Sequence, residues 1–242
     1  MPIKQGSTNF GSLYLGSTKI GSAYVGNVRV FGPAIESATI GGKQYRVVKI
    51  GNQIWMAENL DYMYYGLHND AYQYKDTKSA HYWAKDGVVD RSRGLYYNYE
   101  AAYYLYTMTN TWSTELSGFR VPGVVDYNTL INRVGTSSTA GLHLKSTTGW
   151  NSGFEGDNSS KFNAKPYGYI ASDVDGTLFP INNHYVNDGL YAMFCTWLEA
   201  GSGTEYFNVM TLDGIHDTGK NGAGCGALAR RFEFNMRLVK DV

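Results

Sequence analysis

The chain has 242 residues, of which 43% are hydrophobic and 17% are charged, and its 21 basic residues balance its 21 acidic ones. This composition is that of a folded globular protein and is too apolar for a disordered chain. A net charge of zero provides no overall attraction to nucleic acid or to an anionic membrane, so neither partner is expected. No stretch reaches transmembrane length, and the amino terminus lacks the apolar core of a signal peptide.

Residues 1–32 carry a repeat with a period of ten. Segment 6–11 (GSTNFG) corresponds to 16–21 (GSTKIG), and Tyr14 corresponds to Tyr24. Each unit predicts two short strands joined by a Gly-Ser or Gly-Asn turn, which is too small to bury its own apolar face. We therefore expect either a module for attachment or oligomerisation, including trimer formation, or a hairpin that packs against the rest of the chain.

A linker is predicted over residues 31–34 (FGPA), and a second domain over residues 38–242. This domain opens with two β-rich runs on either side of Gly41 and Gly42, which is the signal of a hairpin. A third strand is expected over residues 53–56, because a Gly-Asn turn precedes an apolar run there.

Two helices are predicted, over residues 98–108 and 126–134. In the second helix Asp126 is the expected N-cap and Gly135 occupies the expected C′ position. In the first helix, apolar side chains recur at the spacing of one helical face, at Ala101, Leu105 and Met108.

The rest of the chain predicts loops and short strands. A loop rich in Gly, Asp, Asn and Ser is expected over 152–165, and a turn at 220–222. Strands are expected over 191–197, which we predict to be buried, over 206–212, where polarity alternates, and over 232–239. The two cysteines, Cys195 and Cys225, form no CxxC pair, so zinc is not expected. We favour two unpaired buried thiols, although the spacing leaves a disulfide between neighbouring strands open.

Five motifs occur in a fixed order, at residues 53–60 (QIWMAENL), 94–102 (GLYYNYEAA), 118–122 (GFRVP), 144–150 (LKSTTGW) and 236–241 (MRLVKD). Together they resemble the Fibrobacter succinogenes major paralogous domain, a family of surface and phage-associated modules. The resemblance extends over roughly residues 38–242. It implies an α+β, C-type-lectin-like fold with two helices and an irregular antiparallel sheet, in which the first and last strands pair.

The resemblance also implies structural roles for the polar residues in these motifs. We expect Trp55 to pack centrally, and Glu58 or Asn59 to bond loop backbone. A fixed arginine can satisfy several loop carbonyls or pair with a buried carboxylate, so we expect Arg120 and Arg237 to do one or the other. Glu58 is one candidate partner for them.

The sequence predicts no catalytic residue, metal or cofactor. The five histidines show no HxH or HxxxH spacing, and there is no GxSxG motif. The fold also occurs in formylglycine-generating enzymes, but Cys195 and Cys225 do not reproduce their cysteine site. The sugar-binding calcium triplets of C-type lectins are absent, and the Asp-Gly strings at 156–158 and 173–176 favour plain turns over calcium loops. An enzyme is the less favoured alternative.

The last fifty residues suggest a binding surface, because apolar anchors alternate there with a heterogeneous polar set. In phage relatives of this fold a diversity-generating retroelement rewrites codons in this region. We expect ligand contacts from eight side chains, namely Trp197, Glu199, Tyr206, Asn208, Asp213, His216, Asp217 and Asn221.

The predicted function is therefore non-enzymatic adhesion, on a phage tail or at a cell surface. The short repeats resemble those in tail proteins of gut bacteriophages, and the expected partner is a host surface protein or glycan. The alternative is a structural protein of the virion or cell envelope, whose carboxy-terminal face packs against neighbours. Burial of Tyr206, His216 and Asn221 would favour that alternative.

Overall fold

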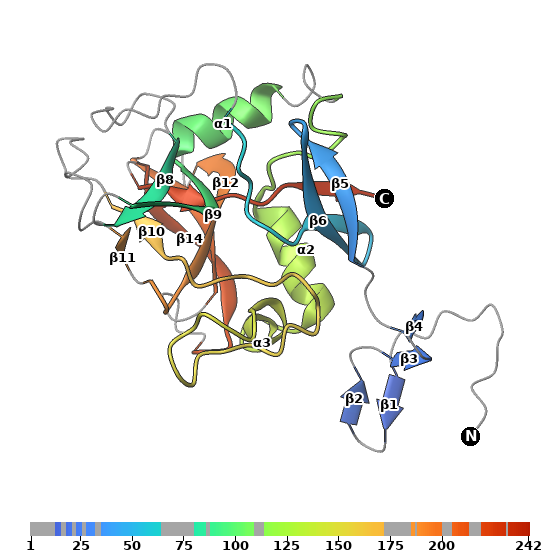
Figure 1. Ribbon diagram of the computed structural model, residues 1–242. Helices are drawn as coiled ribbons and strands as arrows, with labels where there is room; N and C mark the ends of the chain where they lie inside the picture. Colours follow the sequence, from blue (N-terminus) through green and yellow to red (C-terminus); the bar gives the residue numbers. More distant parts are fainter. Residues whose placement is uncertain are drawn as a thin grey trace.

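The computed structural model shows a mixed α+β protein built around two mainly antiparallel sheets (Figure 1). It describes residues 13–15, 18–20, 23–25, 28–31, 35–63, 80–85, 88–108, 114–171, 185–186, 188–199, 205–212, 219–230 and 232–242.

The smaller main sheet holds both ends of the region predicted as the second domain. Its order is β16-β7-β6-β5, and it contains β5 (Ile35–Ile40), β6 (Lys43–Ile50), β7 (Gln53–Met56) and β16 (Val239–Asp241). Gly41 and Gly42 both have positive φ, 56° and 76°, as a tight hairpin turn requires. A Cβ on Gly41 would also lie 2.3 Å from the ring of Tyr62. The predicted hairpin and the strand over residues 53–56 are confirmed.

The larger sheet has the order β14-β13-β12-β15-β9-β8. Its strands are β8 (Ala80–Lys85), β9 (Val88–Tyr97), β12 (Ala192–Glu199), β13 (Tyr206–Leu212), β14 (Ala223–Ala229) and β15 (Phe234–Asn235). All neighbouring strands are antiparallel except β12 and β15. Strand β12 is buried on both faces: Met193 and Cys195 join one hydrophobic cluster, and Phe194 joins the other.

Helices cover the two faces of this larger sheet. Helix α1 packs on β12 in the hydrophobic cluster of Met193 and Cys195 (Figure 1). Helices α2 and α3 belong to the cluster of Phe194, which also includes Trp55. The helices are α1 (Tyr99–Met108), α2 (Val124–Val134) and α3 (Ala140–Leu144). The two predicted helices are therefore present, and the short α3 was not predicted.

The repeat region forms two short hairpins, one in each ten-residue unit. Strand β1 pairs with β2 and β3 with β4, over β1 (Leu13–Leu15), β2 (Thr18–Ile20), β3 (Ala23–Val25) and β4 (Val28–Phe31). A further small ladder joins β10 (Tyr169–Ile170) to β11 (Tyr185–Val186). Of the predicted linker, Phe31 belongs to β4 and residues 32–34 lie outside the described chain.

The caps of α2 differ from the prediction. The helix begins at Val124, and Gly123 is its N-cap. Asp126 still caps the helix, but from the third helical position: its carboxylate accepts the Gly123 N–H at 2.8 Å. At the other end Gly135 has φ of 179°, which is extended and not the left-handed conformation of a C′ glycine.

The predicted last strand was wrong in its extent. Residues 232–239 do not form one strand, because the chain crosses between the two sheets and contributes β15 to one and β16 to the other. Strand β16 pairs with β7 and not with the first strand, β5, so that Val239 lies opposite Trp55. Strand β13 is also more buried than simple alternation predicts, with Met210, Thr211 and Leu212 all buried.

Candidate functional site

The structure does not gather the predicted ligand contacts at one place. Tyr206 starts β13 and pairs with Ala229, whereas Asn221 precedes β14, whose first residue pairs with Leu212 at the other end of the same strand. Seven extended residues span roughly 20 Å, so the two lie at opposite ends of the sheet. Trp197, Glu199 and Asn208 share the Tyr206 end. Asp213, His216 and Asp217 lie outside the described residues.

A β-bulge shapes the end that carries Tyr206. The register of β12 and β13 shifts between Cys195 and Glu199. The bulge is held by Thr196, whose hydroxyl donates to the Asn208 carbonyl at 2.7 Å, and by the Asn208 amide, which donates to the Leu198 carbonyl. Trp197 is half-buried and stacks on Tyr106 of α1, with ring centroids 3.9 Å apart. At this end Tyr206 is exposed, at 51%, and so is Leu198, at 38%.

The first signature motif serves the core, as predicted. Trp55 is fully buried, packs against Tyr127 at 5.1 Å between ring centroids, and donates its indole N–H to Gln53. Asn59 joins distant segments: its amide donates to the Arg93 carbonyl at 2.9 Å, and its oxygen accepts from Arg237 at 3.0 Å. The expectation that Glu58 or Asn59 bonds backbone is confirmed, since Glu58 also accepts a hydrogen bond from the backbone N–H of Arg46.

Arg237 is a buried cation without a carboxylate partner among the described residues. It is 1% exposed, and its guanidinium donates to the carbonyls of Phe162 and Asn163 and to Asn59. The rings of Phe162 and Phe194 lie 4.4 and 5.0 Å from the guanidinium carbon. Burial lowers the pKa of Arg237 to about 9, so it is still charged at neutral pH.

Arg120 has the opposite environment. Its two terminal nitrogens donate to both oxygens of Asp126, at 2.6 and 2.8 Å, and one also reaches Asp241 at 2.8 Å. The hydrogen bonds to Asp126 raise the pKa of Arg120 further above its already high value, against the effect of burial. Both of the roles expected for a signature arginine therefore occur, one in each residue.

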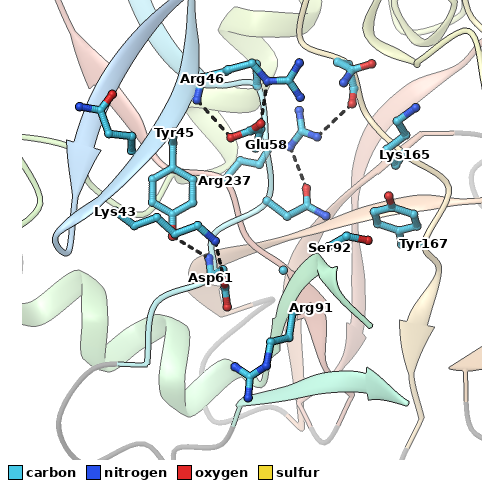
Figure 2. Close-up of a pocket in the computed structure, with 15 residues that line it drawn as sticks. Lys43, Tyr45, Arg46, Glu58, Asp61, Arg91, Ser92, Lys165, Tyr167 and Arg237 are labelled. Atoms are coloured by element: carbon cyan, nitrogen blue, oxygen red, sulfur yellow. Dashed lines mark hydrogen bonds and ion pairs between the residues drawn. The ribbon is translucent and has the colours of Figure 1, made fainter. Parts of the chain in front are cut away.

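A pocket of about 390 Å³ opens beside Arg237 (Figure 2). It is built from β6, the segment after β7, the middle of β9, the loop before β10 and the end of the chain. Its lining is mostly polar, with five basic residues and two acidic ones. The lining residues are Lys43, Gln44, Tyr45, Arg46, Ala57, Glu58, Asn59, Asp61, Arg91, Ser92, Gly94, Asn163, Lys165, Tyr167 and Arg237.

The two carboxylates of the pocket are already engaged. Glu58 accepts from the Arg46 side-chain Nε at 2.6 Å and from its backbone N–H at 3.2 Å. Asp61 pairs with Lys43 at 2.6 Å. Among the described residues, Lys165 donates hydrogen bonds to Thr148 alone, to its hydroxyl at 2.8 Å and to its carbonyl at 3.4 Å. Burial lowers the pKa of Lys165, and the positive charges of Arg237 and Arg46 lower it further.

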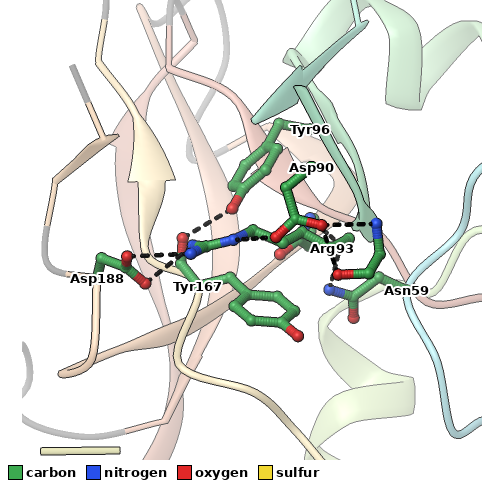
Figure 3. A network of polar contacts seen from close by, with 8 residues as sticks. Asn59, Asp90, Arg93, Tyr96, Tyr167 and Asp188 are labelled. Atoms are coloured by element: carbon green, nitrogen blue, oxygen red, sulfur yellow. Dashed lines mark hydrogen bonds and ion pairs between the residues drawn. The ribbon is translucent and has the colours of Figure 1, made fainter. Parts of the chain in front are cut away.

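An ionic network fixes one wall of the pocket (Figure 3). Arg93 makes a two-pronged contact with Asp188, at 2.9 and 3.3 Å, and a third contact with Asp90. Its guanidinium carbon lies 4.8 Å from the ring centre of Tyr167. The Tyr96 hydroxyl donates to the Tyr167 carbonyl at 2.8 Å, so this tyrosine is held at both its backbone and its ring.

His143 lies in a polar cluster that does not form a hydrolytic triad. His143 lies near Asp157 and Ser159, but both contact the same ring nitrogen, Nδ1, at 2.9 and 3.0 Å. A relay needs the acid and the nucleophile on different nitrogens, so this set is not a hydrolytic triad. No cluster of His, Cys, Asp or Glu that could hold a metal occurs in the part of the chain described. No described helix is long and apolar enough to span a membrane.

The two cysteines are free, as favoured from the sequence. Cys195 is buried on β12 and donates to the carbonyls of Tyr97 and Phe234. Cys225 lies on β14, and β13 separates it from the strand of Cys195. Cys225 is half-buried, whereas full burial was expected. Burial raises the pKa of both thiols, that of Cys225 to about 12, so neither is a reactive thiolate at neutral pH.

The chain belongs to the Fibrobacter succinogenes major domain family, whose model matches residues 48–240. The assignment made from the five motifs is thereby confirmed. No curated protein matches the chain, and no solved structure matches it. The pocket lies within the matched region except for its first residues on β6, yet sequence reasoning missed it. The available signal was the pair of exposed cations, Lys43 and Arg46, that flank a buried tyrosine.

Proposed function

We propose that this chain is a non-enzymatic binding protein on a C-type-lectin-like scaffold, displayed on a phage tail or at a cell surface. Support for the scaffold comes from the smaller sheet, which contains the first and last strands, β5 and β16, at its opposite edges, and from the helices on the two faces of the larger sheet. The scaffold would present a surface to a protein or glycan of the host.

The observation that carries the proposal is the Tyr206 end of the larger sheet. A large aromatic and an aliphatic side chain, Tyr206 and Leu198, are exposed there on a frame fixed by the Thr196 and Asn208 hydrogen bonds. Exposed tyrosine on a rigid frame binds at low entropic cost, because few rotamers are lost. The hairpins at the amino terminus would join copies of the chain, and joined copies would strengthen weak single contacts by avidity.

The test measures binding of the labelled full-length chain to intact cells of gut Bacteroidetes by flow cytometry. The double variant Leu198→Ser and Tyr206→Ser should reduce cell binding at least tenfold, because hot-spot aromatics contribute about 2 kcal/mol or more. Val89→Ser is the matched control, because Val89 is also 51% exposed but lies on β9. Equal binding by all three proteins, or binding to no host, would leave the structural role as the better account.

Diversification is tested separately, by sequencing this locus across isolates of one community. Substitutions concentrated between residues 199 and 221, with Phe194, Val209 and Leu212 constant, would support a retroelement-diversified receptor-binding surface. An even spread of substitutions over the surface would contradict it.

A further inference from the structure

The pocket beside Arg237 shares no residue with the Tyr206 end of the sheet, and it has the features of a second binding site. The chain as a whole has zero net charge, yet the lining of this pocket has five basic residues against two acidic ones. The two carboxylates pair with Arg46 and Lys43, and among the described residues neither forms an ion pair with Lys165 or Arg237, although the charge of Glu58 acts on Arg237 at longer range. The pocket therefore carries a local excess of positive charge.

Arg46 presents an unused hydrogen-bonding edge to this pocket. Glu58 occupies its Nε and its backbone N–H, which fixes the side chain, while the two terminal nitrogens have no partner among the described residues. A pair of terminal guanidinium nitrogens matches two oxygens of a carboxylate, sulfate or phosphate. Glu58 is thus a positioning residue for Arg46.

Lys165 and Arg237 complete a group of three cations from separate segments of the chain. Both Arg46 and Arg237 depress the pKa of Lys165 by charge repulsion, which shows that the three groups share one electrostatic environment. A buried cation that lacks a counter-ion is unfavourable, and a bound anion would relieve that cost. In Figure 2 the Lys165 and Tyr167 side chains lie across the pocket from Lys43 and Tyr45.

The rest of the lining matches a hydroxyl-rich molecule. The Tyr167 hydroxyl has no hydrogen-bonding partner among the described residues, and its ring is held in place by Arg93. Amide and hydroxyl side chains make up much of the remaining wall, and apolar side chains are few. A volume of about 390 Å³ is at the small end of ligand sites and suits one or two sugar rings.

We propose that this pocket binds an acidic sugar, whose carboxylate, sulfate or phosphate lies between Arg46 and Lys165 above Arg237. The sugar ring would contact Tyr167 through its hydroxyls. This proposal does not depend on the Tyr206 surface, so either site can be present without the other.

The test is isothermal titration calorimetry on the full chain with matched sugars. Glucuronate, galacturonate, and the 6-sulfate and 6-phosphate of glucose are compared with neutral glucose and galactose, and with acetate and inorganic sulfate. We expect at least one acidic sugar to bind at least tenfold more tightly than its neutral parent and than the free anion. The tightest member of the series identifies which anion the site takes. Affinity should fall with added salt, since the contact is charged.

Two variants locate the binding. Lys165→Gln keeps a group that can bond Thr148 but removes the charge, and it should weaken the acidic sugar roughly tenfold or more. Arg46→Lys keeps the charge but removes the two-pronged edge, and should weaken it by a smaller factor, roughly threefold. Lys49→Gln is the control, because Lys49 is exposed on the same strand outside the pocket and should leave affinity unchanged.

Three results would overturn the proposal: neutral sugars that bind as tightly as acidic ones, free anions that bind as tightly as acidic sugars, or wild-type affinity in Lys165→Gln. Near-ultraviolet circular dichroism of each variant, compared with the wild type, separates lost binding from lost folding. The cell-binding experiment on Tyr206 and Leu198 has its own readout, so failure of one site is distinguishable from failure of the other.

Discussion

The surroundings of the two signature arginines differ in how each charge is balanced. Arg120 is partly exposed and has two carboxylates, Asp126 and Asp241, within hydrogen-bonding distance. Arg237 is buried and has only carbonyl and amide oxygens. The first region is electrically complete without a ligand. The second leaves positive charge at the edge of an open pocket, which is why we assign binding to it and a structural role to the first.

The largest expected effect is the loss of Arg237. In Arg237→Met the methionine fills part of the space between Phe162 and Phe194, but the carbonyls of Phe162 and Asn163 and the Asn59 oxygen lose their donor. Each buried acceptor left unsatisfied costs about 1–3 kcal/mol, so we expect the free energy of unfolding to fall by about 3–5 kcal/mol. Urea denaturation measures it. A loss below 1 kcal/mol would show that Arg237 is not a structural element, and would leave ligand binding as its only role.

A smaller effect is expected on the Arg120 side, from Asp126→Ala. Asp126 is only 13% exposed and accepts from Arg120, from the Gly123 N–H and from Gln53. Its removal takes away a helix cap and the main partner of a half-buried cation, and we expect a loss of about 2–3 kcal/mol in urea denaturation. Asn at this position keeps an acceptor and should recover part of that loss. A variant as stable as the wild type would mean that α2 does not depend on this cap.

The local elements of these two regions could be predicted from the sequence, but the contacts between distant elements could not. The Gly41-Gly42 hairpin, the strand of Trp55 and both long helices follow from turn chemistry and periodicity over neighbouring residues. Helix α3 is too short for periodicity, and β15 and β16 lie in one stretch of alternating apolar and polar residues that does not show where the chain changes sheets. Strand β13 was expected to alternate, but its second half is buried on both faces, and the sequence does not show which side chains other elements cover.

The pocket could not be predicted, because it is formed by residues that are far apart in the sequence. Asn59 and Arg237 are 178 residues apart and meet only because β16 adds to β7. Strand register of this kind depends on long-range pairing, which a single sequence does not display. The identity of Arg237 as a signature residue was predicted from its motif. Whether it would receive a carboxylate, as Arg120 does, or carbonyls alone, depended on which loops folded over it.

A rise in pH should remove positive charge from the pocket before it affects Arg120. The pKa of Arg237 is about 9, because burial disfavours the charged form, and that of Lys165 is also lowered, whereas that of Arg120 is raised. As pH rises above about 9, the pocket loses positive charge first, so affinity for an acidic sugar should fall by up to about tenfold per unit. Calorimetry at about pH 7, 8, 9 and 10 measures it, with tryptophan fluorescence as the check on folding. An affinity that is constant to pH 10 would remove Arg237 and Lys165 from the binding step.

The smallest expected effect concerns the outer partner of Arg120. Asp241 is 65% exposed, and solvent screens an ion pair of this kind, so Asp241→Asn should lower the free energy of unfolding by no more than about 0.5 kcal/mol. Urea denaturation at low and high salt checks this, and the small difference should shrink further in high salt. A loss close to that of Asp126→Ala would mean that Arg120 needs both carboxylates. The contrast with Arg237 would then be sharper, since one signature arginine would require two counter-ions while the other folds with none among the described residues.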